Sequence, residues 1–130
     1  MLNDIFSRVS ASPTITAAAV TSNTNGSAVD VHNFVGTLQV VLNAGNATAG
    51  TSPTLDVKLQ TSDSNSTNFT DVSGDTFTTV TNVANTGGVQ TLNLVSDTLK
   101  QYVRAVATIG GTASPSFPAS VTVLGINQIN

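Results

Sequence analysis

The chain contains no cysteine, no tryptophan and no glutamate, and only 8% of its 130 residues are charged. Without cysteine, disulfide bonds cannot contribute to its stability. Helical proteins cover their surfaces with Glu, Lys and Arg, and ordinary soluble domains carry roughly 25% charged residues. This chain uses Thr, Ser and Asn instead, which suit strands and turns. The composition therefore predicts an all-β protein.

Basic residues are also few. The four that occur are not clustered in the sequence, and the net charge is −3. Such a chain lacks the electrostatic footprint of a protein that binds nucleic acid or an anionic membrane, so neither is expected as a partner. No apolar run approaches the length of a membrane span, and the first residues, MLNDIFSRV, do not resemble a secretory signal. We expect the protein to be made and folded in a cytoplasm.

The main positive signal is an alternation of apolar and polar residues. In TLDVKLQT (Thr54–Thr61), the apolar side chains Leu55, Val57 and Leu59 lie on one side, as in a strand with one buried face. About eight such runs, separated by turn residues, predict one domain with an antiparallel β-sandwich fold of the jelly-roll type. The other runs are Thr14–Val20, Ala28–Phe34, Gly36–Ala44, Thr76–Val83, Val89–Val95, Lys100–Ile109 and Pro118–Ile126.

The segments between these runs contain turn-forming residues. Asn25-Gly26 and Gly87-Gly88 predict turns. The segment GGTASPSFP (Gly110–Pro118) contains two prolines, each of which lacks a backbone donor. It is predicted to be a connection or an edge and not part of a central strand.

The amino terminus departs from the β pattern. Four apolar residues fall at helical spacing before Ser12-Pro13: Leu2, Ile5, Phe6 and Val9. The sequence thus predicts an N-terminal arm or helical turn over residues 1–13 and a β-sandwich domain over residues 14–130. Two roles for the apolar stripe remain open, packing on its own sandwich or docking on a neighbouring chain.

Side chains that carry catalytic chemistry are few. His32 follows Asp30 by two residues, so a strand would place both on one face, but no G-x-S-x-G motif supports a catalytic triad. The glycine pairs lack the helix and lysine of a phosphate-binding loop. We predict that the protein is not an enzyme and has no catalytic, cofactor-binding or metal-binding residues.

The segment LQTSDSNSTNFTDVSGDTFTTVT (Leu59–Thr81) is the richest in Asp, Asn and hydroxyl groups. Its spacing fails as an EF-hand, although a looser cation site that uses Asp63, Asp71 or Asp75 remains open. Its glycan acceptor triplets are no more frequent than chance predicts. The favoured interpretation is two polar turns that join short strands, with Phe69, Val72 and Phe77 as inward anchors.

Several pieces of the chain, in this order, carry a resemblance: LDVKLQTSDSNSTNFTDV, TFTTVT, VQTLNL and YVRAVATIGGTASPSF. Together they cover roughly Thr54–Leu124, and their pattern resembles a group of small proteins encoded among the head genes of tailed bacteriophages. The resemblance implies a capsid decoration or cement protein that binds the outside of the major capsid protein lattice, often as a homotrimer.

The resemblance implies a protein that is made in the cytoplasm of a bacterial host and is located on the capsid exterior of the virion. The apolar stripe Leu2, Ile5, Phe6 and Val9 provides the candidate capsid contacts. Two alternatives share the fold: a carbohydrate-binding or receptor-binding sandwich displayed on the virion, and a head–tail joining or tail structural protein. The scarcity of aromatic residues disfavours the carbohydrate alternative.

Overall fold

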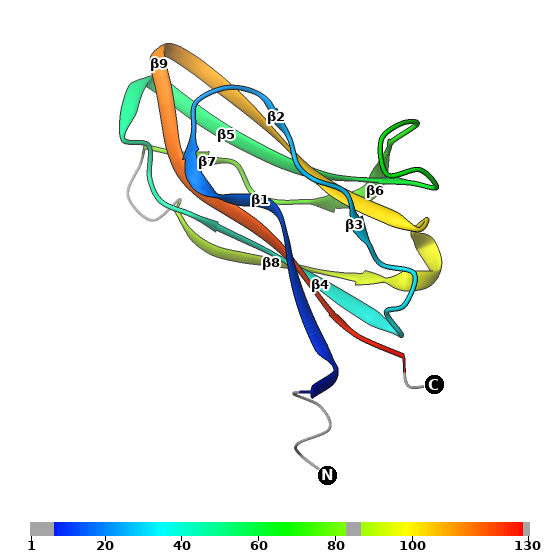
Figure 1. The fold of residues 1–130 in the computed structure, drawn as a ribbon. Coiled ribbons are helices and arrows are strands. Elements are labelled where there is room, and N and C mark those ends of the chain that lie inside the picture. The colour runs from blue at the N-terminus through cyan, green and yellow to red at the C-terminus, as the bar shows by residue number, and fades with distance from the viewer. Residues whose placement is uncertain (1–6, 83–86, 129–130) are drawn as a thin grey trace.

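The long strand β9 (Tyr102–Ile126) organises the fold, because it pairs with β1, β2, β3, β4 and β5 (Figure 1). The computed structural model describes residues 7–82 and 87–128. Every strand pairing within them is antiparallel. The other elements are β1 (Val9–Val20), β2 (Thr24–Asn25), β3 (Val29–Asp30), β4 (Thr37–Ala44), β5 (Ala49–Ser62), β6 (Thr70–Thr76), β7 (Val80–Thr81), β8 (Gly88–Val95) and a 3-10 turn, η1 (Ser96–Thr98).

The sheet is curled into two layers, and β9 belongs to both. Its first half pairs with β5 on one side and with β2 and β3 on the other. Its second half pairs with β1 and β4, and β8 lies beyond β4. Figure 1 shows the orange half of β9 beside β5 and the red half beside β4. We call β1, β9, β4 and β8 layer 1, and β2/β3, β9, β5 and β6/β7 layer 2.

The order of pairing identifies the topology. If β2/β3 and β6/β7 each count as one interrupted strand and β9 counts as two, the described chain has eight strands. The first pairs with the eighth, the second with the seventh, the third with the sixth and the fourth with the fifth. This nested pairing is a long hairpin rolled up on itself, which is a jelly roll. The predicted all-β, jelly-roll-like class is confirmed.

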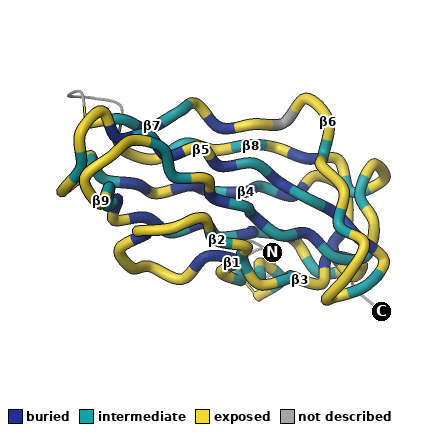
Figure 2. The backbone as a smooth tube through the Cα atoms, turned by 90° about the horizontal axis from the view of Figure 1, so that it is seen from above, coloured by how far each residue is buried: buried dark blue, intermediate teal, exposed yellow. Residues whose placement is uncertain are grey.

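The core lies between the two layers and follows the predicted alternation. In β4, Leu38, Val40 and Leu42 are buried, and in β5 every second residue from Leu55 to Leu59 is buried. Figure 2 shows buried and less buried positions alternating along these strands. Because both layers turn their apolar positions inward, one continuous core forms.

The N-terminal strand is longer than predicted. Its pairing with β9 reaches back to Val9↔Ile126, so residues 9–13 of the predicted arm lie in β1. Val9 is therefore extended and not part of a helical stripe, because strand pairing satisfies its backbone groups. Ser7 and Arg8 have helical geometry just before it. The other stripe residues, Leu2, Ile5 and Phe6, lie outside the described residues.

The predicted turn at Asn25-Gly26 is wrong. Asn25 ends β2 and pairs with Val106, and the Gly26 N–H donates to the Ala105 carbonyl at 2.7 Å. Gly26 serves close packing, since a Cβ atom there would lie 2.4 Å from Thr14 Oγ1. The predicted strand Ala28–Phe34 is also reduced, to β3 and an isolated bridge from Phe34.

The prediction that Gly110–Pro118 avoids a central strand is wrong as well, because this segment lies inside β9. Gly111, Ala113 and Ser114 have positive φ angles of 104°, 58° and 56°. Pairing with β5 is irregular here, with register shifts around Thr51. Pro115 is tolerated because the strand bends from one layer to the other there and its pairing with β5 is interrupted. Pro118 pairs with Ala19 of β1, and its carbonyl accepts from the Gly45 N–H at 2.8 Å, just beyond the end of β4.

Candidate functional surfaces

The outer face of layer 2 carries a network of charged and polar side chains on β5, β6 and β9, which we call the charged face. Lys58 Nζ lies 2.9 Å from Asp71 Oδ2, and Gln60 Nε2 donates to Asp71 Oδ1 at 2.8 Å. Gln60 Oε1 accepts from Arg104 Nε and Nη2 at 3.0 and 2.8 Å. Each charged group of the network therefore has an opposite charge or an amide beside it.

The network lowers the pKa of Asp71 below its usual value, through the hydrogen bond from Gln60 first and then the hydrogen bond and charge of Lys58. We predict that Lys58→Met raises the pKa of Asp71, as followed by NMR titration of the side-chain carboxyl carbon. Lys100→Met is the control, because Lys100 pairs with Asp63. An unchanged Asp71 pKa in Lys58→Met would contradict the assignment.

The same pKa shift fixes the sign of a pH effect on stability. The folded state holds Asp71 at a lower pKa than the unfolded chain does, so it favours the carboxylate. Its stabilising contribution is present above the unfolded pKa and is lost as the pH falls through the folded pKa. Because Asp71 is exposed, solvent screening keeps this contribution small.

Of the three predicted inward anchors, two are correct. Phe77 is buried, and Val72 packs against the core. Phe69 is only half-buried, and the Arg104 guanidinium carbon lies 4.0 Å from its ring centroid. The prediction for Phe69 is wrong because a cation–π contact on the charged face takes the place of core packing.

His32 and Asp30 lie together, but His32 is in a turn after β3 and does not share a strand face with Asp30 as the spacing predicts. His32 Nδ1 lies 2.8 Å from Asp30 Oδ1, and the His32 backbone N–H donates to the same oxygen at 3.1 Å. Burial raises the pKa of Asp30, but the hydrogen bonds from His32 and Gln101 outweigh it, so the pKa is below its usual value. Both side chains are exposed, and in the described part of the chain no serine or threonine hydroxyl bonds to His32. The pair lacks the nucleophile that a triad needs.

Asp63 and Asp71, two of the three residues considered for a cation site, have different partners, and the side chain of the third, Asp75, lies outside the described part of the chain. Asp63 pairs with Lys100 at 3.5 Å, whereas Asp71 belongs to the network of the charged face. Within residues 7–82 and 87–128, no group of three or more His, Cys, Asp or Glu side chains is placed to hold a metal ion.

Over the same residues, no helix has the length and apolar character needed to cross a membrane.

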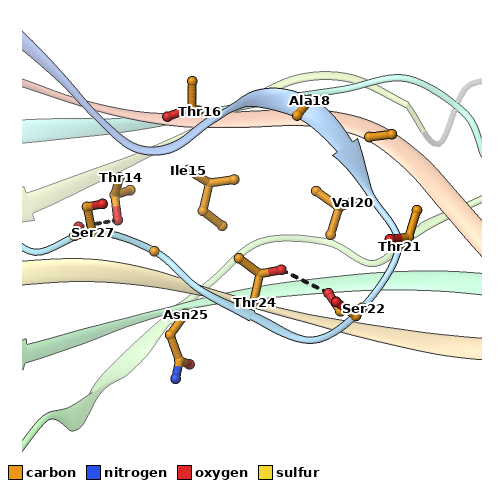
Figure 3. Close-up of a pocket in the computed structure, with 12 residues that line it drawn as sticks. Thr14, Ile15, Thr16, Ala18, Val20, Thr21, Ser22, Thr24, Asn25 and Ser27 are labelled. Atoms are coloured by element: carbon orange, nitrogen blue, oxygen red, sulfur yellow. Dashed lines mark hydrogen bonds between the residues drawn. The ribbon is translucent and has the colours of Figure 1, made fainter.

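A cleft of about 300 Å³ lies between β1 and the segment 21–27 (Figure 3). Ile15 and Val20 lie between these two segments, and Thr14 Oγ1 donates to the Ser27 carbonyl at 2.7 Å. The residues that line the cleft are aliphatic, hydroxyl, amide or glycine residues, with no ionisable side chain among them. The cleft therefore offers neither a general base nor an acid.

The outer face of layer 1 is the opposite of the charged face, and we call it the neutral face. Its side chains come from the alternate positions of four paired strands. No Asp, Lys, Arg or His occurs among the described residues of this face. They are Val9, Ala11 and Pro13 (β1), Ser120, Thr122, Leu124 and Ile126 (β9), Thr37, Gln39, Val41 and Asn43 (β4), and Val89, Thr91, Asn93 and Val95 (β8).

Val9 is the one candidate contact residue that the structure describes. It is exposed, pairs with Ile126 and borders a shallow depression of about 240 Å³ beside Gln39 and Leu124. Arg8, which precedes it, has its guanidinium held by the Asn127 carbonyl at 3.0 and 3.2 Å. Val9 therefore belongs to the neutral face.

The neutral face is not predicted from the sequence. A signal was present, because the non-core positions of TLQVVLNA and VQTLNLV contain no charged residue, whereas those of TLDVKLQT contain Asp56 and Lys58. What the sequence does not show is that β4 and β8 are hydrogen-bonded neighbours, so that their neutral positions combine into one surface.

Comparisons with known proteins give structural likeness alone. No family model matches the chain, and no curated protein matches it. A chain of a Desmodium yellow mottle tymovirus structure is similar, with 10% identity, a TM-score of 0.43 and coverage of 94% of this chain and 89% of that one. A chain in the structure of infectious bursal disease virus Gx strain has 13% identity and a TM-score of 0.48, and the match covers 95% of this chain but 33% of that one.

Proposed function

We propose that the chain is a non-enzymatic structural protein of the capsid decoration or cement type, which binds the outside of a bacteriophage head through its neutral face. The observation that carries the proposal is the absence of charge across four strands of layer 1 in the described residues. Interface cores are depleted in charged residues, because a charge buried without a partner costs several kcal/mol. The resemblance to proteins of tailed-phage head genes supplies the partner, the major capsid protein.

In this arrangement the two layers have different roles. The neutral face contacts the shell with hydroxyl, amide and aliphatic groups, which form neutral hydrogen bonds and apolar contacts. The charged face points to solvent, where its ion pair remains hydrated. Each copy adds its binding free energy to the shell, and a homotrimer multiplies the contacts through effective concentration. Moderate affinity for each contact is then sufficient to stabilise the head.

The described aromatic residues favour this function over carbohydrate binding. Sugar platforms use exposed aromatic rings, whereas Phe34, Phe77 and Phe117 are buried here. Phe69 is covered by Arg104, and Tyr102 is half-buried. A head–tail joining protein could use the same neutral face, and electron microscopy of labelled particles separates the two locations.

The test is a pair of matched substitutions on β9. Thr122→Arg places a charge on the neutral face, and Thr108→Arg places the same charge on the outer face of layer 2. We expect Thr122→Arg to weaken co-sedimentation with capsids by about tenfold or more, which corresponds to about 1.4 kcal/mol, and to lower the temperature at which decorated shells break. Thr108→Arg should bind like the unmodified protein. Equal binding by both variants, or a loss confined to Thr108→Arg, would refute docking by this face.

A further inference from the structure

The two layers have four edge strands, and three of them are protected against pairing with another chain. In layer 1, β1 contains Pro13 and two register shifts around Ile15. In layer 2, β2/β3 consists of two-residue pieces with Asp30 at the end of β3. The other edge of layer 2, β6/β7, is interrupted and irregular opposite Lys58 and Gln60. Prolines, bulges, charges and short strands are the devices that keep edge strands of monomers apart.

The fourth edge, β8, has none of these devices. Its eight residues pair with β4 without a register shift, and its sequence GVQTLNLV contains no charge and no proline. In the described part of the chain, β4 is the one strand that pairs with it. Val89 and Val95 are 65% and 53% exposed, more than any other large apolar residue described. A long, regular, apolar edge of this kind is a template for a further strand.

A side-chain contact from Gln90 also restrains the strand. Gln90 Nε2 donates to the Thr78 carbonyl at 2.9 Å, and the Thr78 N–H donates to Gln90 Oε1 at 2.8 Å. This paired contact ties β8 to the rim of layer 2. The edge is therefore ordered before any partner arrives, which reduces the entropy lost on binding.

One hydrogen bond shows which residues of β8 direct their backbone N–H and C=O groups to β4 and which direct them to the open edge. The Ser96 N–H donates to the Gly36 carbonyl at 3.0 Å, one step beyond the pair Thr37↔Val95. Hydrogen-bonded and non-hydrogen-bonded pairs alternate in an antiparallel ladder. Even-numbered residues of β8 therefore bond to β4, whereas Val89, Thr91, Asn93 and Val95 direct their N–H and C=O groups to the open edge.

We propose that β8 pairs antiparallel with β8 of a second copy of this chain, about a two-fold axis at Leu92. In this register Val89 lies opposite Val95 of the second copy and Thr91 lies opposite Asn93, so apolar side chains meet apolar ones and polar meet polar. All four outward residues then exchange backbone hydrogen bonds with the second copy. Layer 1 of one copy and layer 1 of the other then form one continuous sheet, and the two neutral faces lie on the same side of it.

A second copy is the occupant that this edge fits. The outward positions Val, Thr, Asn and Val are apolar, polar, polar and apolar from either end, as an isologous contact requires. Neither copy brings a charge, whereas a charged partner strand would find no opposite charge on β8. The contact leaves the neutral face free, so it is compatible with docking and would link protomers of neighbouring trimers.

The register makes a sharp test possible, because the chain has no cysteine of its own. In the variant Leu92→Cys the two introduced residues face each other across the axis, with Cα atoms ~4.5 Å apart, within the range of a disulfide. We expect a covalent dimer on mild oxidation. Val89→Cys is the control, since its two copies would lie six residues out of register, ~20 Å apart, and should not cross-link.

Sedimentation of the full chain provides the second measurement. We expect a dimer whose dissociation constant rises about tenfold or more in Thr91→Lys, because a charge enters the uncharged pairing edge. Ala11→Lys, on the protected β1 edge, should leave the dimer unchanged. Circular dichroism melts confirm that each variant is folded. A monomeric unmodified chain, an oligomer unaffected by Thr91→Lys, or equal cross-linking of both cysteine variants would each overturn the proposal.

Discussion

Replacing Thr14 with valine is expected to lower the free energy of unfolding by about 2–4 kcal/mol. Thr14 is buried, and its hydroxyl donates to the Ser27 carbonyl at 2.7 Å and accepts from the Ala105 N–H at 3.0 Å. Valine keeps the shape but removes the oxygen, so the buried Ala105 N–H loses its partner. Leaving this buried N–H without a partner costs about 1–3 kcal/mol, and the lost hydrogen bond to the Ser27 carbonyl adds about 1 kcal/mol. The hydroxyl therefore joins β1 of layer 1 to β9 of layer 2.

The measurement is equilibrium unfolding in urea or guanidinium, together with a thermal melt that should fall by roughly 10 °C for a domain of this size. Thr16→Val is the matched control, because Thr16 is exposed on the same strand. That change should be within about 0.5 kcal/mol of neutral. Equal effects at the two positions would show that the Thr14 hydroxyl does not tie the layers together.

An even larger loss, about 3–5 kcal/mol, is expected for Phe117→Ala. Phe117 is fully buried in β9, at the start of the half that pairs with β1. Truncation removes apolar contacts and leaves a cavity where the strand passes from one layer to the other. Chemical denaturation measures the loss.

Phe69→Ala makes the same chemical change outside the core. We expect it to cost about 1 kcal/mol or less, because the half-buried ring contributes chiefly its contact with Arg104. The two Phe→Ala variants therefore separate core packing from a surface cation–π contact. A loss at Phe69 as large as that at Phe117 would contradict the placement of Phe69 on the charged face.

The alternation of apolar and polar residues predicts most of the strands. It does not predict the irregular segments. Leu55, Val57 and Leu59 are inward as predicted, because period-two burial is a local property of a strand. Gly26 was read as a turn residue, whereas it allows close approach of Thr14, twelve residues earlier in the chain. The two prolines of Gly110–Pro118 predict a connection or an edge, whereas this segment forms the bend of β9. Both errors concern non-local contacts that local pattern does not record.

The candidate capsid-contact residues also show the difference between what local pattern predicts and what non-local pairing decides. Val9 is on the neutral face, but it arrives there as a strand residue paired with Ile126 and not as part of a helix. The neutral face and the open β8 edge were not predicted, because each depends on which strands are neighbours. An uncharged strand such as VQTLNLV has the same sequence whether it lies at the centre or at the edge of a sheet.

The sequence by itself determined the all-β class, the approximate number of strands and the inward positions of most of them, because composition and period-two alternation act within a few residues. The scarcity of catalytic side chains was also visible there. Only the tertiary structure decided that β9 serves both layers, that neutral positions from four strands form one face and that β8 is the unprotected edge. These properties arise from pairing between residues far apart in the chain, where hydrogen bonds and core packing select one register among many that the local patterns permit.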